Sequence, residues 1–438
     1  MRWRIGWGKR FQHRGLGGLR VRLSRFLTPL ERGAVFSSFR LVAIPSLFVT
    51  TFLFFANCRA QENPVFKIDE NITRFAYSAG GRIAYATRHL FSVKKIQLQR
   101  DDIWIAETDG KRRRILLGEK FVRGTGPFSY TVRGMRWSPD GSKLAIELGT
   151  SEMINDDGDT REGVMTLLLD DSGREITIPG ADSVIPGATN AAWATDGASV
   201  LYLTEQAQAN KQAPAAAAGQ PSSNRASSNT ALSSPQTNPP ANKLFTMNRV
   251  KPFVEGASAL FQGHLFSVVA WSLKQDGGVG VERDPGATGA PRLVALDLTR
   301  ETSRVLGTLE GYAGGLTISP AGKRVAYWID NEQLEVREID APNRVARVRV
   351  ALGTLAWSAD EGRVLVKRGS ALRSGGLVWV ALPPLVAVAA GAAPATVEVA
   401  PRSILHELEF RQFDISPDGK FLGVVEPGKR NLLVYPVV

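Results

Sequence analysis

The 438-residue chain has very little of two residue types on which many active sites depend, with one cysteine and four histidines. Cys58 lies near the N-terminus, so the body of the chain can form no disulfide framework and no thiolate zinc site. His89, His264 and His406 lie in the body, but none has a metal-binding spacing such as His-x-x-x-His. We therefore expect no metal site and no cofactor.

The chain also lacks the short motifs of common catalytic sites. It contains no Gly-x-Ser-x-Gly nucleophile elbow, and no Gly-x-Gly-x-x-Gly follows a predicted strand. The nearest approach to a phosphate-binding loop, at Gly322 and Lys323, lacks the upstream glycine and the following Ser or Thr. No catalytic residue is assigned from the sequence, and this favours a protein that is not an enzyme.

The strong basic charge of the chain belongs to one end of it. The net charge is +12 and the pI is near 9.9, values that would normally suggest a nucleic-acid partner. Residues 1–60 carry 11 basic residues and 1 acidic residue, whereas the remainder carries 43 basic and 41 acidic residues. We therefore expect no nucleic-acid partner for the body.

Residues 1–60 have the composition of a leader. A basic stretch precedes Leu41–Ala56, an uncharged apolar run of 16 residues, and Cys58-Arg59-Ala60 follows it. This order is typical of an export signal, here ending near Ala60. A membrane anchor and lipidation at Cys58 are the alternatives, and a true start downstream of Met1 is a further one. We expect a periplasmic or otherwise exported protein that contacts the membrane only through its N-terminal segment.

A short phrase recurs along the rest of the chain: a large apolar residue, then Ser-Pro-Asp-Gly, then a second apolar run. The clearest copies are WSPDGSKLAIEL and ISPDGKFLGVVE, and the intervals between copies run from 39 to 78 residues. Such self-similarity indicates a repeat architecture. The copies begin at Tyr77, Trp137, Trp193, Trp271 (with a shifted Asp-Gly), Ile318, Trp357 and Ile415.

Each copy predicts a β-hairpin. Proline presets the first turn position, aspartate bonds nearby backbone, and glycine adopts the left-handed conformation that closes the turn. A second hairpin follows several copies, as in Ile103–Gly118 and Met165–Gly180. Two hairpins make a four-stranded antiparallel sheet that cannot bury both faces alone, and radial stacking of such sheets gives a β-propeller.

The phrase resembles the WD40-like (PD40) repeats of TolB-type propellers, over roughly Val65–Val438. The resemblance implies an all-β fold with one propeller over residues 61–438. Seven copies suggest seven blades of four antiparallel strands, with six blades as the alternative. The last copy has room for three strands, so we expect Pro64–Ile68 to supply the fourth and close the ring. Gln206–Asn242 is poor in apolar residues and predicts a disordered insert.

Function is expected in the loops between copies, on the rim opposite the Ser-Pro-Asp-Gly turns. The connection His89–Asp101 is basic, the segment around residues 155–162 is acidic, and Gly118–Arg133 between them carries aromatic and arginine residues typical of interfaces. An alternative is that the aromatic residues fill a blade junction. The candidate binding residues are Phe121, Arg123, Phe128, Tyr130, Lys94, Lys95, Asp156 and Asp157.

Three functions remain open at this point. The first is a non-enzymatic scaffold of the cell envelope that binds a protein or peptide. The second is a propeller hydrolase or lyase with a site at the central channel, because such sites combine residues from several blades and leave no linear motif. The third is a domain that senses or binds a small ligand of the cell envelope. Converging histidines or carboxylates in the channel would favour the enzyme, and mixed aromatic and arginine side chains would favour binding.

Overall fold

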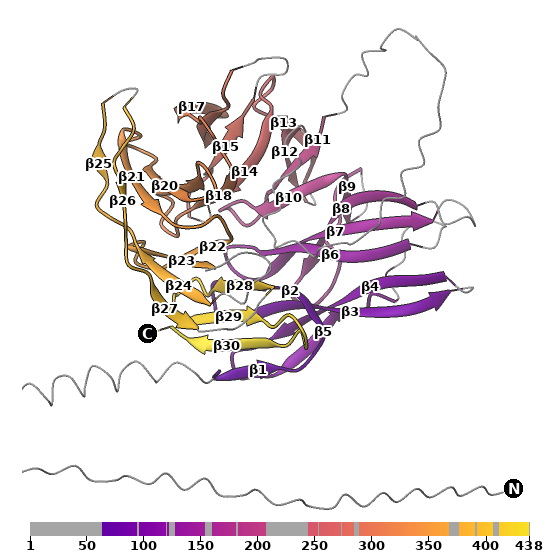
Figure 1. Cartoon of the computed structure of the whole chain (residues 1–438). Coiled ribbons are helices and arrows are strands. Elements are labelled where there is room, and N and C mark those ends of the chain that lie inside the picture. The colour runs from indigo at the N-terminus through magenta and orange to yellow at the C-terminus, as the bar shows by residue number, and fades with distance from the viewer. Residues whose placement is uncertain are drawn as a thin grey trace, which may run out of the picture. The chain divides into compact units, whose positions relative to one another are not determined.

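A computed structural model describes residues 64–93, 96–119, 121, 128–153, 160–180, 183–206, 244–252, 254–272, 274–283, 289–367, 376–389, 392–405 and 411–437. The chain divides into two compact units, Met1–Ala56 and Asn57–Val438, and every described residue lies in the second. The regular structure of these residues is β-strand (Figure 1). None of them belongs to a helix with the length and apolar character needed to cross a membrane.

The described strands form five sheets, two of four strands, one of six and two of eight, in which most neighbouring strands are antiparallel. For reference we divide them into groups of four, counting β1 with the last group and leaving β25 and β26 outside the groups. Group 1 contains β2 (Ile72–Tyr77), β3 (Ile83–Val93), β4 (Ile96–Ala106) and β5 (Arg112–Leu116). Group 2 contains β6 (Phe128–Trp137), β7 (Lys143–Met153), β8 (Thr160–Asp170) and β9 (Val184–Pro186). Group 3 contains β10 (Ala188–Trp193), β11 (Val200–Glu205), β12 (Phe245–Lys251) and β13 (Glu255–Leu260).

The remaining strands continue this pattern. Group 4 contains β14 (Phe266–Trp271), β15 (Gly277–Glu282), β16 (Arg292–Asp297) and β17 (Thr302–Thr308). Group 5 contains β18 (Gly314–Ile318), β19 (Arg324–Trp328), β20 (Gln333–Glu338) and β21 (Arg344–Arg349). Group 6 contains β22 (Leu355–Trp357), β23 (Arg363–Lys367), β24 (Leu377–Ala381) and β27 (Arg402–Leu405). Group 7 contains β28 (Gln412–Ile415), β29 (Phe421–Val425), β30 (Leu432–Pro436) and β1 (Phe66–Ile68).

The recurring phrase forms the first turn of a group, as its residue types predict. In the copy at Trp137, Gly141 has φ of 71° and its N–H donates to the carbonyl of Ser138. The Ser138 hydroxyl accepts from the Lys143 amide at 2.9 Å and donates to Asp140. Ser416 bonds the Phe421 amide in the same way, at 2.9 Å. The serine thus fixes the start of the next strand, a role that the sequence pattern alone did not assign.

The groups are held together by apolar clusters that lie between neighbours. One cluster joins β2–β5 to β6–β8 through Ile103, Trp137 and Leu144, and comparable clusters lie between each later pair of groups. A further cluster joins group 7 to group 1, with Tyr85 from β3 and Leu432 from β30 among its members. Both faces of each sheet are thereby covered, as a stack of such sheets requires.

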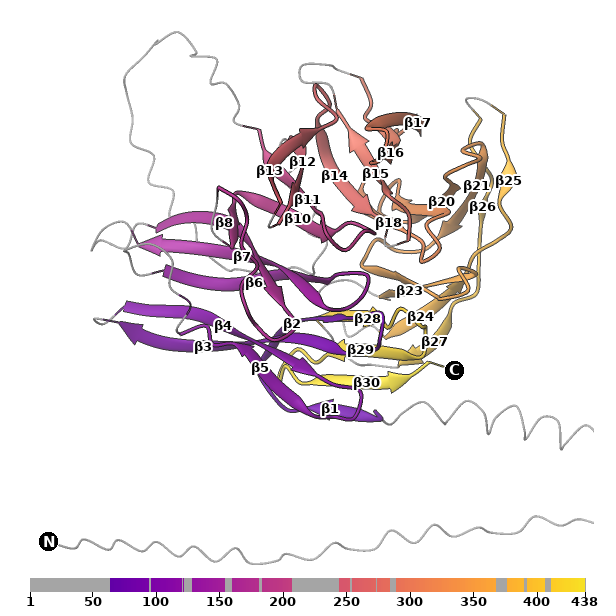
Figure 2. The ribbon, with the colours of Figure 1, turned by 180° about the vertical axis from the view of Figure 1, so that it is seen from behind.

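The two ends of the described chain meet in group 7. β1 pairs antiparallel with β30, Phe66 opposite Val434 and Ile68 opposite Leu432, so residues 64–68 take the expected place in this sheet (Figures 1 and 2). Beside this pair, the side-chain amide of Gln412 accepts from the Phe75 N–H at 3.3 Å and donates to the Phe75 carbonyl at 3.0 Å. We call this junction between β2 and β28 the seam.

Two predicted connections are strands for much of their length, and here the sequence-based expectation was wrong. His89–Asp101 is expected to be a loop, yet β3 runs to Val93 and β4 resumes at Ile96. Likewise β6 begins at Phe128, inside the expected connection Gly118–Arg133. The physical reason is cross-strand pairing: β3 with β4, and β6 with β7, continue their hydrogen-bonded ladders well beyond the apolar core.

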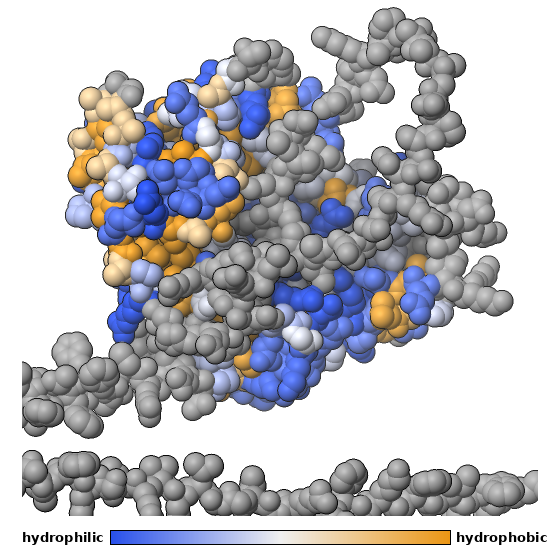
Figure 3. Space-filling view, viewed as in Figure 1, coloured by the Kyte–Doolittle hydropathy of each residue, from blue (hydrophilic) through white to orange (hydrophobic). Residues whose placement is uncertain are grey.

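A second feature that the repeat did not predict lies at the outer edge of group 5. The segment between β24 and β27 contributes β25 (Val386–Ala387) and β26 (Thr396–Val397), which both pair with β21. These strands cover an otherwise open sheet edge. Val386 and Val397 remain exposed, and apolar surface is visible over this region in Figure 3.

The expected leader, residues 1–60, lies outside the described residues, as does the expected insert Gln206–Asn242 apart from Gln206 itself. Both expectations remain predictions. Chain regions on either side of the insert, β11 and β12, pair as direct neighbours from Glu205 opposite Phe245 to Val200 opposite Val250.

Because Ile68 is completely buried in the cluster between groups 7 and 1, its truncation tests the importance of the β1–β30 pair. We expect Ile68→Ala to lower the free energy of unfolding by about 2–4 kcal/mol. Lys67→Ala is the matched control, since the neighbouring Lys67 side chain is 42% exposed and should cost under about 0.5 kcal/mol. Urea denaturation of both variants measures the difference in the free energy of unfolding. If both variants lose equally little stability, packing of β1 is not needed for the stability of the fold.

Candidate binding site in the central cavity

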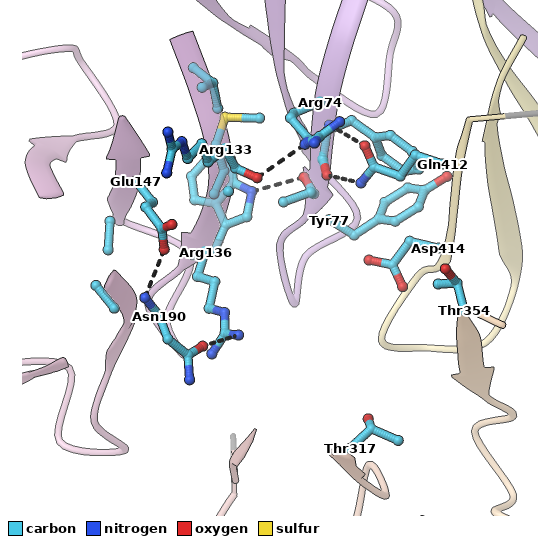
Figure 4. A pocket seen from close by; sticks show the side chains of 18 of the residues that line it. Arg74, Tyr77, Arg133, Arg136, Glu147, Asn190, Thr317, Thr354, Gln412 and Asp414 are labelled. Atoms are coloured by element: carbon cyan, nitrogen blue, oxygen red, sulfur yellow. Dashed lines mark hydrogen bonds between the residues drawn. The ribbon is translucent and has the colours of Figure 1, made fainter. Parts of the chain in front are cut away.

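The first strands of all the groups surround one large cavity. Its volume is about 2280 Å³, and its walls include residues of β2, β6, β10, β14, β18, β22 and β28. Figure 4 shows side chains from several of these strands pointing into it. Sheets packed side by side around a centre place their innermost strands in this way, and we call the space the central cavity. Chemically distinct side chains from distant parts of the sequence meet there.

The walls of the central cavity are more basic than acidic. The acidic side chains among the described lining residues are Glu147, Glu162, Glu205 and Asp414. The basic ones are Arg74, Arg88, Arg133, Arg136, Lys274, Lys429 and Arg430. The described body of the chain therefore concentrates positive charge at this place, although its overall composition is nearly neutral.

Asn190, on β10 of group 3, organises one side of the cavity by bonding to groups 2 and 4. Its backbone N–H donates to Glu147 at 2.7 Å, and its side-chain oxygen accepts from Arg136 at 2.7 Å. The Asn190 carbonyl accepts from the Trp271 indole N–H at 2.7 Å. Asn190 has φ of 51°, a left-handed conformation that asparagine tolerates better than most residues. The network holds the Glu147 carboxylate and the Arg136 guanidinium in fixed positions (Figure 4).

A cluster of arginines lies where the seam meets the cavity. Arg88 makes a two-point ion pair with the buried Asp101, at 2.9 and 3.2 Å. Arg74 donates to the carbonyl of Arg133 at 3.0 Å, and Arg430 donates to the Asn71 side chain at 3.0 Å. Burial lowers the pKa of both Arg74 and Arg430, and neighbouring Arg88 and Arg411 lower it further. We call Arg74, Arg88, Arg411 and Arg430 the seam arginines.

Asp414 and Tyr77 face the cavity on the opposite side from Glu147 (Figure 4). Burial raises the pKa of Asp414 to about 6, and a hydrogen bond from the Ile415 N–H offsets part of this rise. Burial also raises the pKa of the Tyr77 hydroxyl, with a smaller contribution from the Asp414 charge. Among the described residues the Tyr77 hydroxyl, although buried, has no hydrogen-bond partner.

The Ser-Pro-Asp-Gly turns lie closer to the cavity than expected. Ser138, Pro139, Ser319, Pro320, Ser416 and Pro417 are among its lining residues. The sequence suggested that function lies on the rim opposite these turns, but they form the wall of one end of the cavity. The reason is geometric, because each turn directly follows the innermost strand of its group. The other end is formed by the starts of those strands and by the β29–β30 turn, which holds Lys429.

Two of the predicted binding residues lie in the core. Phe121 and Tyr130 are 5% and 2% exposed, and their rings meet edge to face with centroids 5.0 Å apart. The Arg100 guanidinium lies 5.7 Å from the Tyr130 ring. This arrangement corresponds to the alternative that the aromatic residues fill a junction, here between groups 1 and 2.

The other predicted residues are not described as a site. Lys94, Lys95, Arg123, Asp156 and Asp157 lie outside the described residues, and Phe128 is placed only as the first residue of β6. The residues that surround the cavity, such as Arg74, Asn190 and Asp414, were not predicted. Each lies on the innermost strand of its group, where alternating polar and apolar residues are the normal pattern of a strand. The signal that the sequence offers for them is a polar residue directly before or within an apolar run.

Neither of the two described histidines in the body, His89 and His264, lines the cavity. His89 on β3 lies 3.4 Å from Asp102, and His264 before β14 bonds Glu282. His406 lies outside the described residues. Among the residues that the structure places, no group of three His, Cys, Asp or Glu side chains could hold a metal ion.

The raised pKa of Asp414 predicts a pH-dependent stability. Because the folded protein holds this proton more tightly than the unfolded chain, ionisation of Asp414 lowers stability as pH rises from about 4 through 6. Asp414→Asn should therefore raise the free energy of unfolding by about 1–2 kcal/mol at pH 7.5. The gain should shrink towards pH 4.5, as measured by urea denaturation.

Asp418→Asn is the control for that experiment. Burial would raise the pKa of Asp418, but hydrogen bonds from Ser416 and Lys420 lower it overall. Its ionised form is thus favoured by folding, and the asparagine variant should be less stable than the parent at pH 7.5. A stability gain in Asp414→Asn that does not change with pH would contradict the assignment.

This chain resembles known proteins in its three-dimensional structure but not detectably in its sequence. No family model matches the sequence, and no curated protein matches it. A chain of the mitotic checkpoint complex, a WD40-type β-propeller, is similar with a TM-score of 0.50 and 12% identity, over 95% of this chain and 99% of that one. Such low identity establishes shared fold only.

Two further solved structures are similar at lower scores. The β-propeller domain of Cps50 (Swd1) from Myceliophteria thermophila has a TM-score of 0.49 and 11% identity, over 86% of this chain and 99% of that one. TolB from Acinetobacter baumannii has a TM-score of 0.37 and 14% identity, over 70% of this chain and 62% of that one. The antiparallel strand groups around one cavity, together with the first similarity, give this chain a β-propeller fold.

Proposed function

We propose that this protein is an exported, non-enzymatic β-propeller that binds a protein or peptide partner at the mouth of its central cavity. The observation that carries the proposal is the excess of arginine and lysine in the cavity walls, concentrated around the seam. Arginine presents several donors in a rigid plane and is enriched where proteins recognise one another. The similarity to WD40-type propellers is consistent with a protein partner.

The proposed scaffold is a single closed ring of seven blades with repeats of the TolB type. Its support is the arrangement of the described strands in groups of four, with an apolar cluster between each group and the next. The β1–β30 pair and the Gln412–Phe75 bonds would then close the ring. A closed ring leaves no open sheet edge at the seam and keeps the walls of the cavity rigid.

Hydrolysis is the less favoured alternative because two carboxylates of the cavity wall, Glu147 and Asp414, lie apart. Glu147 and Asp414 come from groups 2 and 7 and lie on opposite sides of the cavity in Figure 4. Glu147 is held by the Asn190 amide, and Asp414 by the amide of Ile415. Paired carboxylates acting as acid and base need to approach the same bond from a few ångströms. This separation supports binding over catalysis.

The partner-binding proposal is tested with two exposed lysines of group 7. Lys429 lines the cavity mouth, whereas Lys420 lies on the Ser-Pro-Asp-Gly turn and outside the lining. We expect Lys429→Glu to reduce recovery of a partner from envelope extracts at least tenfold, because it reverses one charge in the basic wall. Lys420→Glu should retain recovery at the parental level, as measured by quantitative mass spectrometry of affinity-captured material. Identical recovery by both variants would place the partner elsewhere.

Export is proposed from the basic leader and the apolar run Leu41–Ala56. Residues 1–60 fused to a reporter enzyme that is active only after export should give activity. Replacing Leu53 and Phe54 with arginine should abolish it, because a charged run cannot act as the apolar core of a signal. Mass spectrometry of the mature protein then distinguishes cleavage near Ala60 from a retained anchor or a lipid on Cys58. Reporter activity equal in both fusions would contradict export by this segment.

A further inference from the structure

The seam arginines come from the two ends of the described chain. Arg74 lies on β2 and Arg88 on β3, whereas Arg411 directly precedes β28 and Arg430 lies between β29 and β30. The carbonyl of Arg430 accepts from the Ile72 N–H at 2.9 Å, so the backbone itself joins the two halves of the cluster. Asn71 bonds both Arg88 and Arg430 through its side chain. Arg74, Arg88 and Arg430 line the cavity, and the charge of Arg411, which is not among the lining residues, acts on Arg74 and Arg430.

Two carboxylates act on the cluster, Asp101 through direct bonds to Arg88 and Glu147 through its charge on Arg74. Both oxygens of Asp101 bond to Arg88, and Oδ2 also accepts from the Val132 amide at 2.7 Å and from the Thr73 hydroxyl at 3.4 Å. Asp101 therefore supplies a single negative charge beside the four seam arginines. The bonds of Arg430 that the structure describes go to the uncharged Asn71 side chain. Positive charge thus remains in excess at the seam.

The mutual effect of these arginines supports the same conclusion. Beyond burial, the charges of Arg88 and Arg411 lower the pKa of both Arg74 and Arg430, and the Asp101 carboxylate offsets part of this lowering. Like charges held at this range oppose one another, and an anion placed among them would relieve the repulsion. Guanidinium groups pair with carboxylates through two parallel hydrogen bonds, which makes this cluster suited to acidic side chains.

An apolar side chain lies beside the cluster. Leu90 is 66% exposed, lines the cavity mouth and is paired across β3 and β4 with Gln99, which also lines it. A large exposed aliphatic residue beside a charged cluster provides a contact for an apolar side chain of a ligand. The described lining at this mouth offers leucine and arginine rather than exposed aromatic rings, which single-stranded nucleic acids use for stacking.

We propose that the seam arginines and Leu90 form a binding site for an acidic peptide segment that carries an aliphatic residue. The inference rests on the proposed partner-binding function and names the chemistry of the partner. Carboxylates of the segment pair with Arg411 and Arg430, and its aliphatic side chain packs on Leu90. The site exists only when the first and last strand groups are joined, so binding also reports an intact seam.

The test measures fluorescence anisotropy of two labelled peptides with the full exported body, residues 61–438. One peptide is octaglutamate, and the other has the same length with a leucine at two positions. We expect both to bind, the leucine-containing peptide several-fold more tightly, and both more weakly as salt rises. Arg411→Gln with Arg430→Gln should weaken octaglutamate binding at least tenfold. Arg430→Lys, which keeps the charge but cannot form two parallel hydrogen bonds with one carboxylate, should weaken binding less than the double glutamine variant does.

Matched controls separate charge at the seam from charge in general. Arg174 and Arg300 are 85% and 80% exposed and pair with Asp170 and Asp297 on other turns. The double variant Arg174→Gln with Arg300→Gln removes the same charge and should bind like the parent. Leu90→Ser should abolish the tighter binding of the leucine-containing peptide relative to octaglutamate. Unfolding curves of every variant confirm that the seam is intact.

Several results would overturn the inference. The first is that neither peptide binds at low salt. The second is that the two double variants lose peptide affinity equally. The third is that a single-stranded oligonucleotide displaces the labelled peptide at a lower concentration than unlabelled peptide does. Failure here is distinguishable from failure of the proposed function. If the Lys429-dependent partner is still captured while the peptides do not bind, the scaffold function stands and the acidic-segment assignment falls.

Discussion

A four-stranded antiparallel sheet with apolar residues on both faces is stable only when both faces are covered, and this constraint governs the described part of the protein. Each group of strands meets the next through a buried cluster, and the last meets the first through Ile68, Phe75 and Leu432. At the seam, the sheet faces that cover each other come from residues far apart in the sequence. There the Gln412 amide satisfies both backbone groups of Phe75, which would otherwise be buried without partners.

The same constraint creates the central cavity. Sheets packed side by side bring their innermost strands towards one another, but these strands do not fill the space between them. Side chains at those positions can therefore be polar without disrupting the apolar clusters, which lie farther out. Arg136, Glu147 and Asn190 show how such polar residues are held by one another rather than by solvent. The candidate site is thus a by-product of the packing that stabilises the fold.

Positive charge at the seam follows from the closing junction. Arg88 is tied to Asp101 within group 1, and Arg430 reaches Asn71 from group 7. Neither ion pair nor hydrogen bond could be inferred from sequence spacing, because the partners are 13 and 359 residues apart. A net charge near zero for the body also concealed a local excess of arginine. The net charge of a sequence adds all charges together, whereas binding of a partner depends on where the individual charges lie in the folded protein.

The sequence determined the local chemistry of this protein. Ser138, Asp140 and Gly141 specify a turn through bonds within a few residues, so the recurring phrase predicted the hairpins, the all-β class and the place of residues 64–68 beside the last strand. Tertiary structure decided the rest. It extended β3, β4 and β6 through cross-strand pairing, buried Phe121 against Tyr130, and gathered the seam arginines. Turn conformation depends on neighbours in the chain, but burial and electrostatic environment depend on neighbours in space.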